Sequence, residues 1–349
     1  MWRETPSQTT RSILSGAVAL IALLSVARCA TCQNTPMISG GVGFLSSTNK
    51  GPTSFSPTVM PLVAVPLTQH FLFETRDYLL ESVTPRKNGL SDQTMLLKGV
   101  SYLQLDYLAN RHATFVAGKF LTPFNTYNER LSPIWIGNFQ DSPIIFPIGN
   151  MGGAATGGEL RGSLFSTRKM NVDYTAFYSA NVGGKQFKSS RATGDRIEAY
   201  FPSIRMEVGL SFGKMFEGDH QYAGGAHFWW QPVGGPLSIR SEYAHGSHAQ
   251  GYWMEAGYRL SQFKGPDSVI GRFEPLFRMQ QVFRNSPDST DGLPAVDTQR
   301  ADFGLDYFLP HDVRINTSYS RQFSSTGNGN IWKTGLVYRF MFPAWPGKQ

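Results

Sequence analysis

Cysteine is nearly absent from this 349-residue chain, and the two that occur, Cys29 and Cys32, lie close together near the N-terminus. Cleavage of a leader after Cys32 would leave a mature chain without thiols, which needs no oxidative folding. Cleavage before Ala30 would keep Cys32. Lipid modification of a cysteine is a third arrangement, although Arg28 and Thr31 fit a lipoprotein cleavage site poorly.

The chain also lacks an apolar run long enough to cross a bilayer as a helix. The run Ser12–Val26 (SILSGAVALIALLSV) falls short of the ~20 residues that a spanning helix needs. It follows Arg3 and Arg11 and precedes a stretch rich in small residues, which is the pattern of a secretory signal peptide. We therefore predict a signal peptide over residues 1–32 and an exported domain over residues 33–349. Such a domain can enter a membrane only as a closed barrel.

Motifs for catalysis, cofactor binding and metal binding are missing as well. The sequence contains no Walker loop, no His-Glu-x-x-His and no Gly-x-Ser-x-Gly, and no Cys-x-x-Cys pair follows residue 32. His245 and His248 form a dense histidine feature, but no acidic neighbour in sequence completes a catalytic set. We predict that this cluster is exposed at a strand end, and that the protein is not an enzyme and needs no cofactor or metal.

Charged residues are sparse at 16%, and the net charge of +7 is not gathered into a run of lysine or arginine. Such a distribution does not indicate a nucleic-acid partner. Glycine (36 residues) and aromatic residues (13%) are abundant instead. This composition favours an all-β chain with many turns.

After residue 32, segments of about ten residues alternate apolar and polar side chains, and turn residues separate them. This is the sequence signature of a transmembrane antiparallel β-barrel. Fourteen segments show this pattern clearly. Two more, Met37–Ser46 and Thr58–Leu67, show it weakly, so both fourteen and sixteen strands are compatible with the sequence. The clear segments are Phe71–Glu81, Lys98–Ala109, His112–Leu121, Ala155–Ser166, Lys169–Ala180, Gly194–Phe201, Arg205–Phe216, Tyr222–Gln231, Pro236–Gly246, Gly251–Phe263, Val269–Arg284, Thr298–Leu309, Asp312–Phe323 and Asn330–Phe342.

The two faces of the C-terminal segments separate cleanly. In Thr298–Leu309, Phe303 and Leu305 share one face, while Asp302 and Asp306 share the other. A soluble β-sandwich would also alternate. Tyrosine, tryptophan and phenylalanine at the strand ends of the apolar face, and charges of both signs on the polar face, favour a barrel with aromatic girdles and a polar lumen.

One long segment interrupts the alternation. Gly118–Asn150 (GKFLTPFNTYNERLSPIWIGNFQDSPIIFPIGN) begins on a strand and continues for about thirty residues, and loops of that length inside a compact fold are usually functional. Its start, Gly118-Lys119-Phe120 followed by Pro123-Phe124, resembles the G-[KR]-F-x-x-P-F element of the phosphate-selective porin O/P family. Tyr338, Phe340 and Phe342 are similar to the aromatic C-terminal signal of outer-membrane proteins, although seven residues follow Phe342.

The resemblance implies a sixteen-stranded porin in the bacterial outer membrane. Its partners would be outer-membrane lipid and small solutes or ions, with a homotrimer as the common assembly. It also implies a loop that folds into the lumen and narrows the pore; the alternative is a loop that caps the barrel from outside. The candidate constriction residues in this loop are Asn125, Tyr127, Glu129, Arg130 and Trp135.

Strand parity assigns basic and acidic side chains to the lumen in equal numbers. A selective anion pore needs a positive field along its path, whereas here both signs lie two residues apart on many strands. Pairs such as Glu159/Arg161 and Arg300/Asp302 suggest ladders that hold the wall rigid. The basic candidates are Arg161, Arg196, Arg205, Arg240, Arg259, Arg272, Arg278, Arg300, Arg314, Lys333 and Arg339. The acidic candidates are Asp106, Glu159, Asp173, Glu198, Glu207, Glu242, Glu255, Glu274, Asp302, Asp306 and Asp312.

The sequence therefore predicts passive diffusion of small polar or ionic solutes rather than phosphate selectivity, with at most a weak anion preference from the net basic charge. The alternative is a non-conducting structural or binding barrel whose lumen is plugged by paired charges and the long loop.

Overall fold

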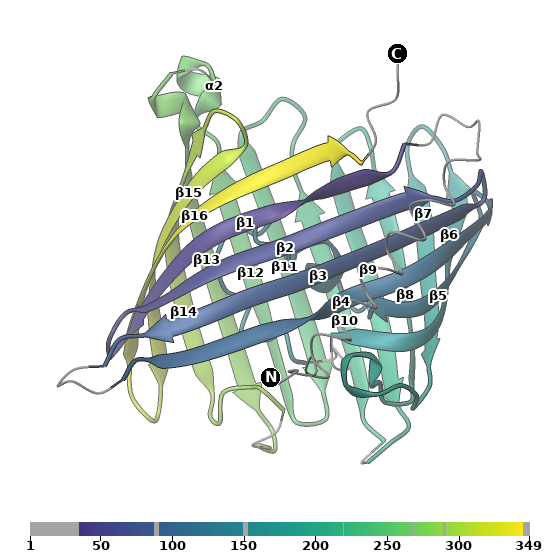
Figure 1. Ribbon diagram of the computed structural model, residues 1–349, viewed down its shortest axis with the longest axis horizontal. Coiled ribbons are helices and arrows are strands. Elements are labelled where there is room, and N and C mark those ends of the chain that lie inside the picture. The colour runs from purple at the N-terminus through teal and green to yellow at the C-terminus, as the bar shows by residue number, and fades with distance from the viewer. Residues whose placement is uncertain are drawn as a thin grey trace, which may run out of the picture.

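The computed structural model describes residues 35–86, 91–148, 153–218, 220–266, 268–288 and 291–344. Sixteen antiparallel strands in these ranges pair in chain order, and the sheet closes between the first strand and the last (Figure 1). The predicted barrel is confirmed, and its strand number is sixteen. The predicted signal peptide, residues 1–32, lies outside the described residues.

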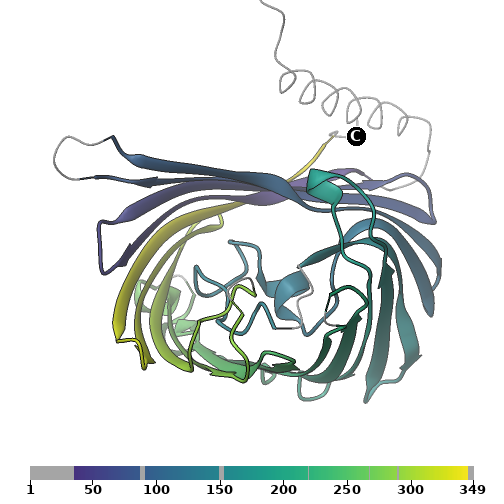
Figure 2. The same ribbon diagram turned by 90° about the horizontal axis from the view of Figure 1, so that it is seen from below.

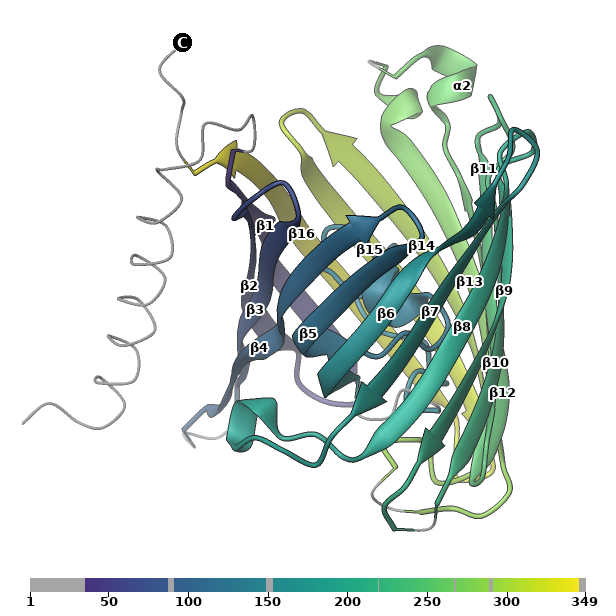
Figure 3. The same cartoon turned by 90° about the vertical axis from the view of Figure 1, so that its right-hand side faces the viewer.

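The strands are β1 Met37–Asn49, β2 Ser54–Pro66, β3 Phe71–Thr84, β4 Gln93–Asn110, β5 Ala113–Leu121, β6 Ala154–Ser166, β7 Asn171–Ser179, β8 Ala192–Phe201, β9 Met206–Met215, β10 Tyr222–Trp230, β11 Leu237–Gly246, β12 Ala249–Tyr258, β13 Phe273–Arg284, β14 Thr298–Leu309, β15 Val313–Ser324 and β16 Gly329–Pro343. They run at a tilt around the barrel (Figure 3). None of the helices in the described ranges is long and apolar enough to span a membrane.

The alternation of side chains along each strand decides what faces the lumen. In β14, Asp302 and Asp306 are fully buried inside the barrel, while Phe303 is 54% exposed on the outer surface. Phe303 contacts Phe277 of β13 with 5.2 Å between ring centroids, so aromatic side chains pack against each other across the outer face. The arrangement inverts that of a soluble protein, with apolar groups outside and charges inside, as lipid requires.

Several predicted strand boundaries are wrong, and four of them misplace charged residues that were assigned to lumen-facing strand positions. Arg259 follows the end of β12, and Asp312 is exposed in the turn before β15. Arg205 lies in the turn before β9 with a φ of 50°, and it is exposed. Arg272 ends a short 3-10 helix, η4 (Ile270–Arg272), immediately before β13. Sequence alternation continued through these turns, so parity placed each residue on a strand that begins one residue later or ends one residue earlier.

The connection between β5 and β6 is the one that shapes the interior. We call residues Thr122–Gly153, of which 122–148 and 153 are described, the inner loop. Figure 2 shows it lying within the ring of strands rather than over its end. It contains one turn of π-helix, η2 (Tyr127–Leu131). Of the two alternatives that the sequence left open for this segment, a loop inside the lumen and a cap outside the barrel, the described residues show the first.

The exposed outer face gives a first testable prediction. Replacing Phe303 with arginine would place a charge in the lipid-facing band of β14, so we expect a loss of about 2–4 kcal/mol in the free energy of folding into lipid vesicles. Phe303→Leu, which keeps an apolar group there, is the matched control. Denaturant titration in vesicles measures both variants; equal stability of the two would mean that this face does not contact lipid.

Candidate functional site

The inner loop is closed at its base by one amide side chain. Asn128 donates hydrogen bonds from Nδ2 to the carbonyl oxygen of Thr122 at 3.2 Å and to that of Gly153 at 2.6 Å. These two carbonyls lie at the beginning and the end of the loop, and Asn128 is buried. The side chain therefore connects the two ends of the loop to each other, independently of the contacts that the loop makes with the wall.

A carboxylate of the wall holds the first turn of the loop. Glu242 on β11 accepts hydrogen bonds at Oε1 from the backbone N–H groups of Thr126 and Tyr127, both at 2.7 Å, and from the hydroxyl of Thr126 at 2.9 Å. Its Oε2 accepts from Trp253 Nε1 at 3.0 Å. Glu242 is 5% exposed, so these donors replace the water that the buried charge has lost. The free N–H groups at the start of η2 are satisfied at the same time.

Apolar side chains seal the region around Glu242. Tyr127 meets Trp253 edge to face with ring centroids 6.1 Å apart, and it meets Phe146 at 5.4 Å. Phe124, Leu131, Ile145 and Ile148 of the loop form one buried cluster with Ala223, Ala244, Ala249, Trp253 and Val282 of the wall. The exclusion of water strengthens the hydrogen bonds to Glu242.

Ion pairs continue the attachment on both sides of this cluster. Arg130 contacts Glu207 of β9 at 2.6 Å and Glu198 of β8 at 2.8 Å. Glu129 pairs with Arg196 of β8, whose guanidinium also donates to the carbonyl of Asn125 at 2.7 Å. Two adjacent loop residues of opposite charge thus meet opposite charges on the same part of the wall.

Asp141 is the acidic centre of the second half of the loop. Its carboxylate meets Arg278 of β13 at 3.3 Å, Lys333 of β16 at 3.2 Å and Arg300 of β14. Burial by itself raises the pKa of Asp141, but the attraction of Arg278, Arg300 and Lys333 outweighs it and holds the pKa below the ordinary 3.8. The loop therefore places a carboxylate among three cationic side chains of the wall.

The loop reaches the opposite wall as well. The indole of Trp135 lies over Gly41 of β1, where an added Cβ would be 2.6 Å from its ring. Arg314 of β15 donates to the carbonyls of Ile134 and Gly137 at 2.9 and 2.7 Å. The loop thus crosses the lumen and is held from both sides.

The five predicted constriction residues all lie in this loop, and the structure brings them to the wall. Asn125 is 4% exposed and holds β9 through Ser211, Tyr127 and Trp135 pack on walls, and Glu129 and Arg130 form ion pairs. Their predicted effect on solute flow stays a prediction.

Most of the charges assigned to the lumen from strand parity do lie on the inner face. Ion pairs connect Arg161 with Glu159, Arg196 with Glu198, Arg300 with Asp302, Arg240 with Glu255, Arg259 with Glu274, Arg278 with Asp302 and Arg314 with Asp306. The first three join neighbours on one strand; the others join different segments. Arg339 shares the parity of Lys333 but is exposed near the end of β16.

Sequence reasoning missed two important groups. Asp141 stands in a loop without alternation, so no parity rule applied to it. His227 of β10 is 5% exposed and lies between the carboxylates of Glu198 and Glu207. It shares the inner face with Ala223 and Trp229, but the glycines of Tyr222–Trp230 concealed the alternation that would have identified it.

No protein-family model matches the chain, and neither does any curated protein sequence. Solved structures match its shape. A loop L8 deletion mutant of OmpT, an outer membrane protein of Vibrio cholerae, aligns with a TM-score of 0.59 at 10% identity over 88% of this chain and 100% of that one. OprB of Pseudomonas putida at low pH gives 0.54 at 11% identity over 92% and 95%. OccAB3 of Acinetobacter baumannii gives 0.52 at 10% over 89% and 100%. At these identities the likeness shows the fold alone.

Glu242→Gln tests the attachment of the loop. The NH₂ group of the glutamine amide would face N–H and O–H donors that now bind the carboxylate. Loss of these charged hydrogen bonds costs about 3 kcal/mol. We expect a lower midpoint of thermal unfolding and tryptic cleavage after Arg130. Glu81→Gln, the same change at an exposed site on β3, should shift stability by less than about 0.5 kcal/mol. Resistance of the Glu242 variant to trypsin would show that the carboxylate does not hold the loop.

Asp141 predicts a pH dependence of stability. Because its folded pKa is below the unfolded value of about 3.9, the stabilisation is fully present above that pH and is lost as the pH falls further. The stability difference between the wild type and Asp141→Asn should therefore be constant from neutral pH to about pH 5 and shrink below about pH 4. A difference that already shrinks near neutral pH would contradict the ion-pair assignment.

Proposed function

We propose that the protein is a porin-like channel of the bacterial outer membrane, exported by the signal peptide 1–32, through which small polar or ionic solutes diffuse passively. The observation that carries the proposal is the inner loop, which is held inside a polar lumen by ion pairs to the wall, in a barrel whose outer face is apolar. The likeness of the fold to outer membrane proteins supports this location.

The charge arrangement favours weak ion selectivity. Most arginines along the inner wall are paired with carboxylates of the wall or the loop, as Arg278 is with Asp302 and Asp141. A paired guanidinium projects little field into the path of an ion. We therefore propose a near-neutral pore, with at most a weak anion preference from the net charge of +7. The likeness of Gly118–Phe124 to the phosphate-selective porin family favours anion selectivity, whereas this pairing favours a weakly selective pore.

Outer-membrane lipid is the proposed partner of the apolar outer face, and a homotrimer is the proposed assembly by the same resemblance. The absence of enzymatic activity also stays a prediction. The plugged, non-conducting barrel is the second outcome of the experiment that follows, because the inner loop contacts both sides of the lumen.

Planar-bilayer recording tests the channel. The wild type should give discrete current steps, and Glu242→Gln should give larger steps because the loop is released from β11. Glu81→Gln should conduct like the wild type. A wild type without current, with current appearing in Glu242→Gln, would establish the plugged barrel instead.

Reversal potentials in a salt gradient test the charge pairing. A near-neutral pore should give a potential close to zero, slightly on the anion side. Asp141→Asn leaves three cationic neighbours with one carboxylate fewer, so the potential should move further toward anion selectivity. Strong anion selectivity in the wild type would show that the paired arginines do control ion passage.

A further inference from the structure

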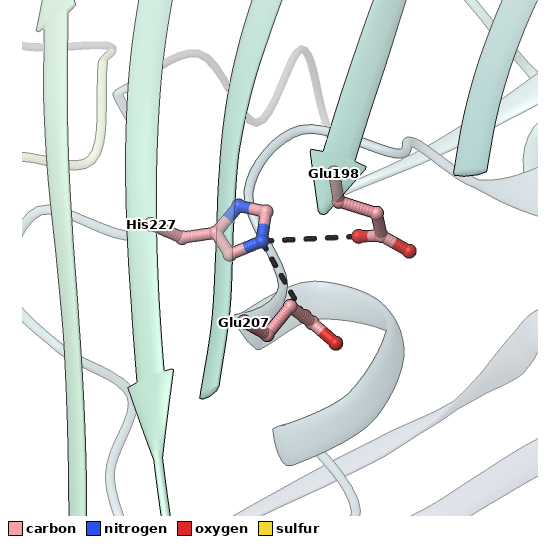
Figure 4. A group of neighbouring side chains, drawn as sticks. All are labelled: Glu198, Glu207 and His227. Carbon is pink, nitrogen blue, oxygen red and sulfur yellow. Dashed lines mark ion pairs between the residues drawn. The ribbon is translucent and has the colours of Figure 1, made fainter. Parts of the chain in front are cut away.

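Three side chains of adjacent strands converge on one point of the inner wall. His227 of β10, Glu198 of β8 and Glu207 of β9 direct ligand atoms toward one another (Figure 4), and these atoms all lie within 4.8 Å. Nε2 of His227 is 3.4 Å from Oε1 of Glu207 and 3.8 Å from Oε2 of Glu198. Among the described residues, this is the one group of three or more histidine, cysteine or acidic residues with such spacing.

The histidine in this group is buried, and its Nε2 faces two carboxylates. The side chain is 1% exposed, Nδ1 has no hydrogen-bond partner, and Nε2 is 3.4 Å from Glu207 and 3.8 Å from Glu198. A buried imidazole facing two carboxylates is a donor set of the type that transition metals take.

The wall is shaped to admit the imidazole. Gly209 of β9 pairs directly with His227. A Cβ on Gly209 would press against the Cε1 atom of the ring and lie 2.7 Å from Nε2. Glycine is therefore the residue that lets the ring approach the backbone of β9 this closely. This cradle holds Nε2 toward the carboxylates.

The spacing suits a single ion. Ligands of a tetrahedral zinc ion at about 2.1 Å are about 3.4 Å from one another, close to the observed 3.4 and 3.8 Å. We propose that Glu198, Glu207 and His227 bind one divalent transition-metal ion of the Zn²⁺ class. Three protein ligands leave a fourth position for water. This proposal replaces the prediction from sequence that the chain has no metal site.

The site is coupled to the inner loop through Arg130. Its guanidinium contacts the same two carboxylates, with Nη1 on Oε1 of Glu207 at 2.6 Å. The ion and Arg130 compete for that oxygen, because both are cations and it cannot serve both at full strength. Arg196, with Nε 3.1 Å from Oε2 of Glu198, adds to the competition. Metal binding would therefore weaken the attachment of η2 to β8 and β9.

Binding is tested by titrating Zn²⁺ alone into the detergent-solubilised full protein, prepared without a polyhistidine tag, in a calorimeter. The wild type should bind one ion. His227→Gln should lower the affinity at least about 100-fold, because one ligand is lost. Arg130→Gln should raise it about tenfold, because the competing cation is gone. His245→Gln, the same change at an exposed histidine, should bind like the wild type.

Co²⁺ in place of Zn²⁺ gives an independent readout, since its visible absorption reports ligand number and geometry. A band present in the wild type and Arg130→Gln and absent in His227→Gln supports the site. No stoichiometric binding by either the wild type or Arg130→Gln overturns it, as does equal loss of binding in His227→Gln and His245→Gln. Gel migration before and after heating confirms that each variant is folded.

The electrical readout of this coupling rests on the proposed channel function, whereas the metal binding does not. If the protein conducts, Zn²⁺ should alter the current steps of the wild type and leave those of His227→Gln unchanged. A protein that binds Zn²⁺ without any current would retain the metal site and lose the channel. A protein that conducts but binds no Zn²⁺ would retain the channel and lose the metal site.

Discussion

The attachment of the inner loop depends on one constraint, which is that a charge removed from water inside the barrel needs a partner. A buried ion pair gains little over an apolar pair of the same size, but removing one partner leaves an uncompensated charge at a cost of about 3–5 kcal/mol. Glu242, Arg130 and Asp141 all obey this constraint. Each ties the loop to a different part of the wall, so the loop has one position in which all three are satisfied.

The wall and the loop have different origins of order. The wall is ordered by its backbone ladder, which is complete because β1 pairs with β16. The loop has almost no regular backbone structure, and its position comes from side chains of the wall. Substitution of a wall charge therefore acts on the loop first, and the barrel around it stays closed.

Strand parity was sufficient for the fold because lipid and lumen impose a strict period of two. It placed Asp302 and Phe303 on the correct faces without any knowledge of neighbouring strands. It could not supply the pairing between strands. Arg240 shares its strand with Glu242, yet it pairs with Glu255, its direct neighbour on β12, because Glu242 is occupied by the loop. Register and loop position both had to be known before that partner could be identified.

The pairing of β1 with β16 also has a consequence for how the molecule forms. Met37 lies opposite Pro343, so this ladder joins the first strand of the sheet to the last. A contact between such distant positions carries a large loop-closure entropy and forms slowly. Until it forms, both terminal strands present unpaired backbone groups that can recruit other chains. Biogenesis of this barrel is therefore exposed to aggregation until the full chain has been synthesised, and a helper that shields these two edges would act at the step where the chain is most vulnerable.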